Sequence, residues 1–366
     1  MRFLHVVGAR PNFMKIAPIM AALRDFDSVQ QSLVHTGQHY DRAMSQVFFE
    51  ELGIPRPDVD LGIGSDTHGA QTGRMMVELE RVFKERQPDC VVVVGDVNST
   101  LAAALVAVKL GVPCAHVEAG LRSFDRRMPE EINRIVTDRI ADFLLTPSAD
   151  ADENLRVEGV SEASIQRIGN VMIDTLLAHL DAAKARGTAA SLGLPPGAFA
   201  LATLHRPSNV DDPDVLRSIL STFDWIQSRI PLLFPLHPRT RKRLEEFSLM
   251  AEAEAMPNLK LSEPLGYLDF LSLTADAQVV LTDSGGLQEE TTVLGVPCIT
   301  LRESTERPVT VTVGTNVIVG SDGQAIRENV SAVLEGRAKR GKVPELWDGK
   351  ASERAAEFLL GTLESD

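Results

Sequence analysis

The sequence is poor in the features that mark membrane, secreted or disulfide-stabilised proteins. Three cysteines occur in 366 residues, Cys90, Cys114 and Cys298, and each lies inside an apolar run. They show no metal-ligand spacing and imply no disulfide framework, which suits a reducing compartment. The apolar run in MRFLHVVGARP ends at Gly8, so it predicts a first strand rather than a signal peptide. No apolar stretch approaches the roughly 18 residues of a membrane helix. We therefore expect a cytoplasmic protein that does not bind a membrane.

Basic residues are also fewer than acidic ones. The chain has 37 lysines and arginines against 51 acidic residues, which gives a net charge of −14. No run of lysine and arginine points to a nucleic-acid-binding face, which needs clustered cations. If the ligand is an anion, the overall field repels it, so a few well-placed cations must hold it.

What the sequence does contain is a repeated strand-and-helix pattern. A length of 366 residues predicts roughly two domains, and short apolar runs alternate with helical segments throughout. Such runs are typical of parallel sheets covered on both faces. The runs are 3–7, 32–35, 90–94, 114–117 and 143–145, then 199–203, 232–236, 258–261, 278–282, 297–301 and 316–319. The fold class predicted is α/β, with two Rossmann-like, doubly wound parallel-sheet domains and an interdomain cleft.

We expect an N-terminal domain over 1–170 and a C-terminal domain over 171–350. Segment 184–198 is rich in Gly, Ala and Pro and favours a boundary region. Segment 351–366 predicts an amphipathic helix that packs back on the first domain. Ligands of open α/β sheets bind at the carboxyl ends of the strands, so the loops there are the places to look for chemistry.

In the first half, charged residues follow the predicted strands. Arg10 and Lys15 lie at the start of a helix, where cations are disfavoured unless an anion such as phosphate is present. Asp96 follows the strand CVVVV, and Glu118 follows CAHV. Glu130 lies in P-E-E-I-N-R at a predicted helix start. Buried carboxylates are costly, so Glu118 in particular suggests a function.

The second half places histidines and a glycine turn at the same kind of position. His205 and His237 each follow an apolar run. Segment 282–290, T-D-S-G-G-L-Q-E-E, opens a helix with small residues whose N–H groups are suited to a diphosphate. Glu290 has the chemistry to accept hydrogen bonds from a ribose diol. Arg307 in T-E-R-P adds a cation.

Each of these positions also has a purely structural explanation. Asp96 is suited to capping a helix, and Pro129 with acidic residues is a good helix start. Glu118 has Arg122 as an ion-pair partner nearby in sequence. His205 fits a hydrogen-bonded strand end, and the glycine turn fits a simple helix cap. No zinc-protease, serine-hydrolase or cysteine–histidine motif is present, so neither a metal nor another cofactor is expected.

Taken together, G-A-R-P-N-F-M-K, H-V-E-A-G-L-R, P-E-E-I-N-R, T-D-S-G-G-L-Q-E-E and T-E-R-P resemble the non-hydrolysing UDP-N-acetylglucosamine 2-epimerase family over nearly the whole chain. The resemblance implies the GT-B fold and a homodimer. It implies interconversion of UDP-N-acetylglucosamine and UDP-N-acetylmannosamine by anti elimination of UDP and re-addition to a 2-acetamidoglucal.

The resemblance also implies roles for individual residues. The residues that match the family's catalytic positions are Asp96, Glu118, Glu130 and His205. Those that match its UDP- and substrate-binding positions are Arg10, Lys15, Ser284, Gly285, Gly286, Glu290 and Arg307, and we add His237 to this group. Carboxylates acting as acid and base at C2 and cations stabilising the departing diphosphate are what this chemistry requires.

Several positions depart from the family pattern. The first loop reads G-A-R-P-N where G-T-R-P-E is common, and the second reads G-D-V-N-S-T where G-D-T is common. Members that UDP-N-acetylglucosamine activates at an adjacent site carry a motif that Gln38 and His39 match, but Asp41 and Thr67 depart from it. Such activation is therefore not implied.

Three alternative functions remain open. H-T-G-Q-H-Y-D and R-S-F-D-R-R-M also look like the branch that epimerises UDP-2,3-diacetamido-2,3-dideoxyglucuronic acid, where Arg126 and Arg127 face a substrate carboxylate unless they are solvated loop charges. A GT-B glycosyltransferase with an acceptor is a second alternative, and a catalytically silent sugar-nucleotide-binding protein is a third. The three acidic residues of the first-half loops favour the epimerase over the silent module.

Overall fold

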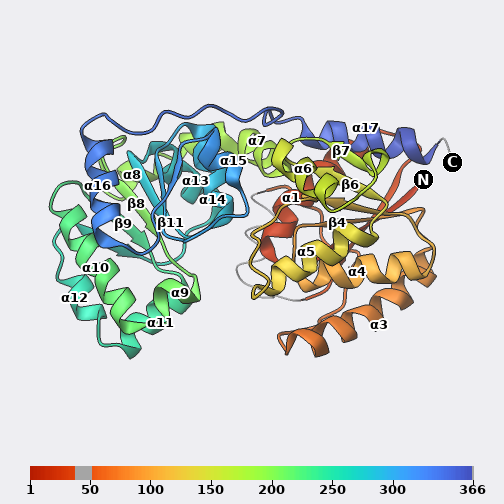
Figure 1. Cartoon of the computed structure of the whole chain (residues 1–366), viewed down its shortest axis with the longest axis horizontal. Helices are drawn as coiled ribbons and strands as arrows, with labels where there is room; N and C mark the ends of the chain where they lie inside the picture. The colour runs from red at the N-terminus through yellow and green to blue at the C-terminus, as the bar shows by residue number, and fades with distance from the viewer. Residues whose placement is uncertain (38–51, 365–366) are drawn as a thin grey trace. The chain divides into compact units, whose positions relative to one another are not determined.

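The computed structural model describes residues 1–37 and 52–364 and falls into two compact α/β units (Figure 1). Unit 1 comprises Met1–Ala178 and Glu345–Asp366, and unit 2 comprises His179–Pro344. Helix α7, Val171–Ala185, begins in unit 1 and ends in unit 2. Helix α17, Ala351–Leu363, belongs to unit 1 and packs against its first helix.

Unit 1 is built around a seven-stranded parallel sheet in the order β3-β2-β1-β4-β5-β6-β7. The strands are β1 Arg2–Val7, β2 Gln30–His35, β3 Val59–Asp60, β4 Cys90–Val94, β5 Cys114–Val117, β6 Phe143–Thr146 and β7 Ile165–Arg167. The chain runs outward from β1 to β3 and then returns to β4 beside β1. The strand order therefore reverses between β1 and β4, which is where doubly wound folds bind ligands.

Within the described part of unit 1, the remaining helices connect these strands, as parallel pairing requires. They are α1 Arg10–Arg24, α3 His68–Arg86, α4 Asn98–Lys109, α5 Pro129–Ile140, α6 Ala149–Val157 and the short 3₁₀ helix η1 Glu162–Ser164. Helices α3, α4 and α5 pack side by side. Leu4, Val6, Val91 and Val93 form a buried cluster with residues of α3 and α4. This apolar layer holds the strand ends of β1 and β4 in fixed register.

Unit 2 repeats the plan with a six-stranded parallel sheet in the order β10-β9-β8-β11-β12-β13. The strands are β8 Ala200–Thr203, β9 Leu232–Pro235, β10 Leu259–Ser262, β11 Val279–Thr282, β12 Cys298–Thr300 and β13 Asn316–Ile318. Its helices are α8 Thr188–Ser191, α9 Pro207–Val210, α10 Pro213–Gln227, α11 Pro238–Glu246, α12 Met250–Glu254, α13 Tyr267–Asp276, α14 Gly285–Leu294, α15 Pro308–Thr312 and α16 Gly323–Leu334. Here the order reverses between β8 and β11.

The sheet of unit 2 is buried on both faces, because alternate residues of β8 join different clusters. Ala200 and Ala202 pack in a cluster that includes α10 residues, whereas Leu201 packs in a second cluster with Leu273 and Leu287. Burial of both faces explains why the strands are continuously apolar in sequence. The three cysteines are free and buried, which confirms their interpretation as core residues.

The predicted fold class is confirmed as two doubly wound parallel-sheet domains. The sequence pattern also predicts a helix over 41–52, and most of that segment lies outside the described residues. The short outer strands β3 and β7 were not predicted. Within residues 1–37 and 52–364, no helix combines the length and apolarity needed to cross a bilayer.

Candidate active site

In unit 1, a buried ion pair lies at the point where the strand order reverses. Lys15 Nζ from α1 contacts Glu118 Oε2, and Glu118 directly follows β5. Gly95, after β4, packs against this pair: a Cβ added there would lie 3.2 Å from Lys15 Nζ and 3.4 Å from Glu118 Oε2. Its φ is +69°, so glycine is suited both to the space and to the backbone conformation.

Glu118 itself has a φ of +70°, in the left-handed region that non-glycine residues rarely adopt. Such conformations persist where the surrounding structure enforces them, and they are concentrated at functional sites. The alternative pairing of Glu118 with Arg122 is wrong. Arg122 instead binds Asp138 at 2.6 Å and Glu158 at 2.7 Å. Lys15 therefore pairs with a carboxylate of the protein.

The second carboxylate of unit 1, Asp96, follows β4 and is positioned by α5. Its Oδ2 forms an ion pair with Arg134 Nη1, and its side chain remains 32% exposed. Arg134 is anchored from the other side, because its Nη2 lies 2.5 Å from Glu131 Oε2. Asn133 Nδ2 donates to the carbonyl of Asp96 at 2.9 Å. Sequence reasoning did not single out Arg134, although it lies in the quoted motif P-E-E-I-N-R.

The two glutamates of that motif differ in environment. Glu131 is buried and accepts hydrogen bonds from the backbone N–H groups of Ser123 at 2.9 Å and Phe124 at 2.8 Å. Burial opposes ionisation, yet these N–H groups and Arg134 hold the pKa of Glu131 below its usual value. Glu130 lies in the first turn of α5 and is half-buried. Glu131 is thus used in fixing the loop, while Glu130 keeps partial contact with solvent.

The first loop is fixed by Asn12. Its Oδ1 accepts the Ala9 N–H at 2.8 Å, and its Nδ2 donates to the carbonyl of Val94 at 3.0 Å, which ties the turn after β1 to β4. Arg10 begins α1, but its side chain lies outside the described part of the structure, as do Gln38, His39 and Asp41. Thr67 precedes α3 and is exposed.

The loop before α5 carries the arginines considered for a uronate substrate. Arg127 Nε lies 2.8 Å from Asp125 Oδ1, and the Arg127 side chain is almost fully exposed. Arg126 is exposed as well. Their geometry is that of loop charges open to solvent.

In unit 2, His205 follows β8 and lies against Asp283, which follows β11. His205 Nδ1 is 2.7 Å from Asp283 Oδ1, with side-chain exposures of 37% for the histidine and 0% for the aspartate. Asp283 also accepts the backbone N–H groups of His205 and Arg206, at 3.0 and 2.9 Å, and Nδ2 of Asn209 at 3.0 Å. Burial favours the neutral acid, but His205 and these donors lower the pKa of Asp283. Sequence reasoning quoted Asp283 without assigning it a role.

His237 lies beside this pair, with its ring centroid 5.6 Å from that of His205. It caps α11, because its Nδ1 accepts the Arg239 N–H at 3.2 Å. Burial, followed by the positive charge of His205, lowers the pKa of His237. The structure therefore brings the two predicted histidines of unit 2 together at adjacent strand ends.

The glycine turn begins α14 as predicted. Ser284 is the N-cap residue, and Gly285 is the first residue of the helix. A Cβ added at Gly285 would lie 2.8 Å from Arg307 Nη1 and 2.9 Å from Glu306 Oε1, so only glycine fits without displacing them. Gly286 follows in the first turn. Free N–H groups at such a helix start are suited to a phosphate.

Two further predicted binding residues lie around α14. Arg307 is buried and binds Glu289 Oε1 and Glu306 Oε1, each at 2.7 Å. Glu290 is buried and accepts a hydrogen bond from Tyr267 Oη at 3.4 Å. Burial raises the pKa of Glu290 to about 7, which the Tyr267 hydrogen bond opposes and the charge of Glu289 reinforces. Both residues are thus in place beside the turn, with protein partners.

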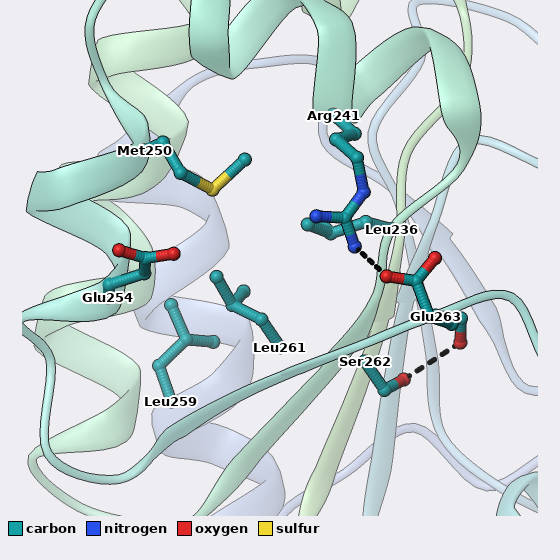
Figure 2. A pocket seen from close by; sticks show the side chains of 8 residues that line it. All are labelled: Leu236, Arg241, Met250, Glu254, Leu259, Leu261, Ser262 and Glu263. Atoms are coloured by element: carbon teal, nitrogen blue, oxygen red, sulfur yellow. Dashed lines mark hydrogen bonds and ion pairs between the residues drawn. The ribbon is translucent and has the colours of Figure 1, made fainter.

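A separate surface cavity of about 500 Å³ occurs elsewhere in unit 2 (Figure 2). Figure 2 shows Met250, Leu259 and Leu261 opposite the ion pair of Arg241 and Glu263, which measures 2.6 Å. The full lining is Leu236, Arg241, Met250, Glu254, Leu259, Leu261, Ser262 and Glu263. None of the predicted site residues lines it. Within the described ranges, no group of three His, Cys, Asp or Glu residues is arranged to hold a metal ion.

Two Rossmann-like sheets, each with ionisable side chains at its reversal point, define an α/β enzyme of the GT-B type. Residues 21–360 match the sequence profile of UDP-N-acetylglucosamine 2-epimerase. The chain belongs to the UDP-N-acetylglucosamine 2-epimerase family, as its motifs predicted, and is an isomerase-type enzyme.

Individual relatives agree with this assignment. The UDP-N-acetylglucosamine 2-epimerase of Methanocaldococcus jannaschii is 44% identical over 365 residues, covering 98% of this chain and 99% of the relative. A crystal structure of that organism's enzyme with UDP-GlcNAc and UDP superposes with a TM-score of 0.91 and 44% identity, over 99% of this chain and 100% of the other. The UDP-2,3-diacetamido-2,3-dideoxy-D-glucuronate 2-epimerase of Pseudomonas aeruginosa is also 44% identical, over 363 residues, covering 98% of this chain and 99% of the relative.

Proposed function

We propose that this enzyme interconverts UDP-N-acetylglucosamine and UDP-N-acetylmannosamine. The observation that carries the proposal is the ion-paired arrangement of Asp96 and Glu118 at neighbouring strand ends of unit 1. A protein that only binds a sugar nucleotide has no use for carboxylates held beside Lys15 and Arg134. Crystal structures of relatives with bound UDP-GlcNAc support the choice of substrate class.

The proposed reaction breaks two bonds of the sugar and restores them. A carboxylate removes the C2 proton while the C1–O bond breaks, and the bonding electrons leave with UDP to give a 2-acetamidoglucal. UDP then adds back at C1, and an acid on the other face returns a proton to C2. The proposed acid–base set is Asp96, Glu118 and Glu130 in unit 1, because proton transfer on two faces needs more than one such group.

Unit 2 is proposed to hold the UDP portion. The helix start formed by Ser284, Gly285 and Gly286 is suited to the diphosphate, because the N–H groups of the two glycines lie in the first turn of α14 and the helix dipole also favours an anion there. Glu290 is proposed to bind the ribose, and His205 with His237 to stabilise the charge that develops on the departing phosphate oxygen. Arg10, Lys15 and Arg307 complete the proposed binding set. Lys15 and Arg307 are each held by a carboxylate of the protein.

A second substrate is supported by a specific observation. The diacetamido-glucuronate epimerase of P. aeruginosa is as similar to this chain as the M. jannaschii enzyme. We therefore propose UDP-2,3-diacetamido-2,3-dideoxyglucuronic acid as the alternative substrate. Arg126 and Arg127 are proposed to meet its carboxylate, since both arginines are exposed on the loop that precedes Glu130.

The test is an incubation with UDP-N-acetylglucosamine in D2O, followed by proton NMR of C2. We expect deuterium at C2 and a manno product without any acceptor, and the same assay with the uronate decides between the two substrates. Sugar transfer only on addition of an acceptor would identify a glycosyltransferase, and binding without turnover of either substrate would identify a silent module. Free N-acetylmannosamine would indicate a hydrolysing enzyme instead. The homodimer remains a prediction, which light scattering in solution can check.

A further inference from the structure

The carboxylate of Asp283 is surrounded by hydrogen-bond donors. The backbone N–H groups of His205 and Arg206 and the amide of Asn209 all point to it, at 2.9 to 3.1 Å. The remaining neighbour is His205 Nδ1 at 2.7 Å. An ionised carboxylate only accepts hydrogen bonds, so Nδ1 of His205 must carry a proton. The lowered pKa of Asp283 agrees with the ionised form.

This contact also determines what the other ring nitrogen can do. With Nδ1 bound to Asp283, Nε2 is the nitrogen of His205 left for a ligand. The aspartate is fully buried, whereas the histidine is partly exposed. A buried carboxylate that fixes the tautomer and ring direction of a histidine is a recurring arrangement in catalysis and metal binding.

His237 is fixed through a different contact. Its Nδ1 accepts the Arg239 N–H and therefore carries no proton, so its ring proton is on Nε2. Two imidazoles with ring centroids 5.6 Å apart thus have opposite arrangements at Nδ1, one donating and one accepting. His237 therefore presents an Nε2–H to an anion, and His205 presents one as well when its ring is protonated on both nitrogens.

We infer that Asp283 is a positioning residue for His205: its buried carboxylate holds the proton on Nδ1 and stabilises the imidazolium form, whose Nε2–H donates to the phosphate of the departing UDP, with Nε2–H of neighbouring His237 as a second donor. This inference rests on the proposed function for the identity of the anion. The hydrogen-bond geometry that carries it lies entirely within unit 2.

Unit 1 contains a second histidine–aspartate pair, which can be compared with the pair of unit 2. His116 Nδ1 lies 2.6 Å from Asp138, but its Nε2 is bound to the carbonyl of Gly95 at 2.8 Å, and both side chains are buried. That pair has no ring nitrogen left for a ligand. A histidine–aspartate contact alone is therefore insufficient, and the open second nitrogen distinguishes the pair of unit 2.

The test combines nitrogen-15 NMR of the histidine rings with steady-state kinetics. In the wild-type enzyme we expect His205 to be protonated at Nδ1 and His237 to be the Nε2–H tautomer, with assignments from His205→Asn and His237→Asn. Asp283→Asn should lower kcat about 10²-fold while KM and the Kd for UDP change less than about threefold. Asp214→Asn, which removes an exposed carboxylate of the same unit, should leave kcat, KM and the Kd for UDP unchanged.

Several outcomes would overturn the inference. A wild-type spectrum with Nδ1 of His205 unprotonated removes its basis, whether or not Asp283→Asn folds. A folded Asp283→Asn with wild-type kcat, or with a loss only in KM, contradicts a positioning role. The proposed function fails separately: if no C2 exchange occurs but the predicted tautomers are found, the epimerase assignment is wrong while the geometry of the pair stands.

Discussion

The two units each place a histidine against a buried aspartate, and the surroundings of the two pairs differ. His116 and Asp138 are 0% and 1% exposed. The second ring nitrogen of His116 is hydrogen-bonded to the carbonyl of Gly95. In the pair formed by His205 and Asp283, only the aspartate is fully buried. The same contact therefore supports the fold in unit 1 and, in the proposed site of unit 2, prepares a histidine for a ligand.

The pair of unit 1 belongs to a larger buried network. Asp138 also accepts the Gly120 N–H at 3.0 Å and binds Arg122 at 2.6 Å. Because His116 holds the carbonyl of Gly95 and Asp138 holds Gly120, the network fixes the backbone on both sides of the site that contains Asp96 and Glu118. In unit 1 the charges at the site are carboxylates neutralised by cations. In unit 2 the candidate site combines two histidines and a helix N-terminus with the ion pairs of Arg307.

The largest expected effect is a loss of turnover when the carboxylates of the unit 1 site are replaced. It distinguishes these residues from the buried network that supports them. Asp96→Asn, Glu118→Gln and Glu130→Gln should each lower kcat by about 10²-fold or more with the fold intact, because each removes a proton-transfer group. Turnover is measured by NMR, and folding by circular dichroism. Near-normal rates in all three variants would contradict the assignment of chemistry to unit 1.

The buried network should instead control stability. Asp138→Ala leaves His116 and Arg122 without their shared carboxylate, and breaking a buried ion pair costs about 3–5 kcal/mol. We expect that loss in the unfolding transition of unit 1, measured by urea denaturation. Asp125→Ala, which removes the half-buried partner of the exposed Arg127, should cost much less, because ion pairs at the surface contribute little to stability. Equal losses for the two variants would show that the network is not the support we describe.

Glu290 allows a pH test of unit 2. Its pKa is raised to about 7 when folded, so the folded state binds the extra proton more tightly than the unfolded chain does. The associated stability is present below the unfolded pKa of about 4.5 and is lost as pH rises through about 7. Glu290→Gln should remove that slope, a difference on the order of 3 kcal/mol at most. Urea unfolding at pH 5 and pH 8 compares the variant with the wild type.

If the free energy of unfolding changes equally with pH in the wild type and in Glu290→Gln, Glu290 does not titrate in this range. Groups other than Glu290 are common to the two proteins, so their contributions cancel in the comparison. The result would sharpen the contrast with Glu131 of unit 1, whose pKa is held low by N–H groups and Arg134.

The smallest effect concerns the glycine turn. Gly285→Ala must displace Arg307 or Glu306, so we expect Kd for UDP to rise about tenfold, which corresponds to about 1.4 kcal/mol. Gly73→Ala in α3 is the matched control, because nothing lies within 4 Å of a Cβ added there. Isothermal titration calorimetry measures both. Unchanged UDP binding in Gly285→Ala would remove the turn from the proposed binding site.

The fold was predictable because most strands are buried on both faces and therefore read as continuous apolar runs. The strands β3 and β7 were missed for the opposite reason: their residues are only partly buried or exposed, so they give no such signal. The site loops were found because parallel strands place their carboxyl ends at one edge of a sheet.

The partners within the site were harder to predict. Lys15 and Glu118 are 103 residues apart in sequence, and only the topology brings them together. Asp283 directly follows a buried strand, and that position indicated a site residue. The glycines after it directed the interpretation to a diphosphate-binding turn instead. Arg134 was not identified from the sequence, because Pro129 and the acidic residues after it already explained this segment as a helix start.

In the proposed reaction, the C1–O bond to UDP breaks while the C2 proton is removed. Positional isotope exchange detects this cleavage, with UDP-N-acetylglucosamine that carries oxygen-18 in the bridge between C1 and phosphorus. We predict that the label moves to non-bridging positions of the β-phosphate during epimerisation, since released UDP can rotate before it adds back. Complete retention of the label in the bridge, while C2 exchanges with solvent and epimerises, would contradict the elimination.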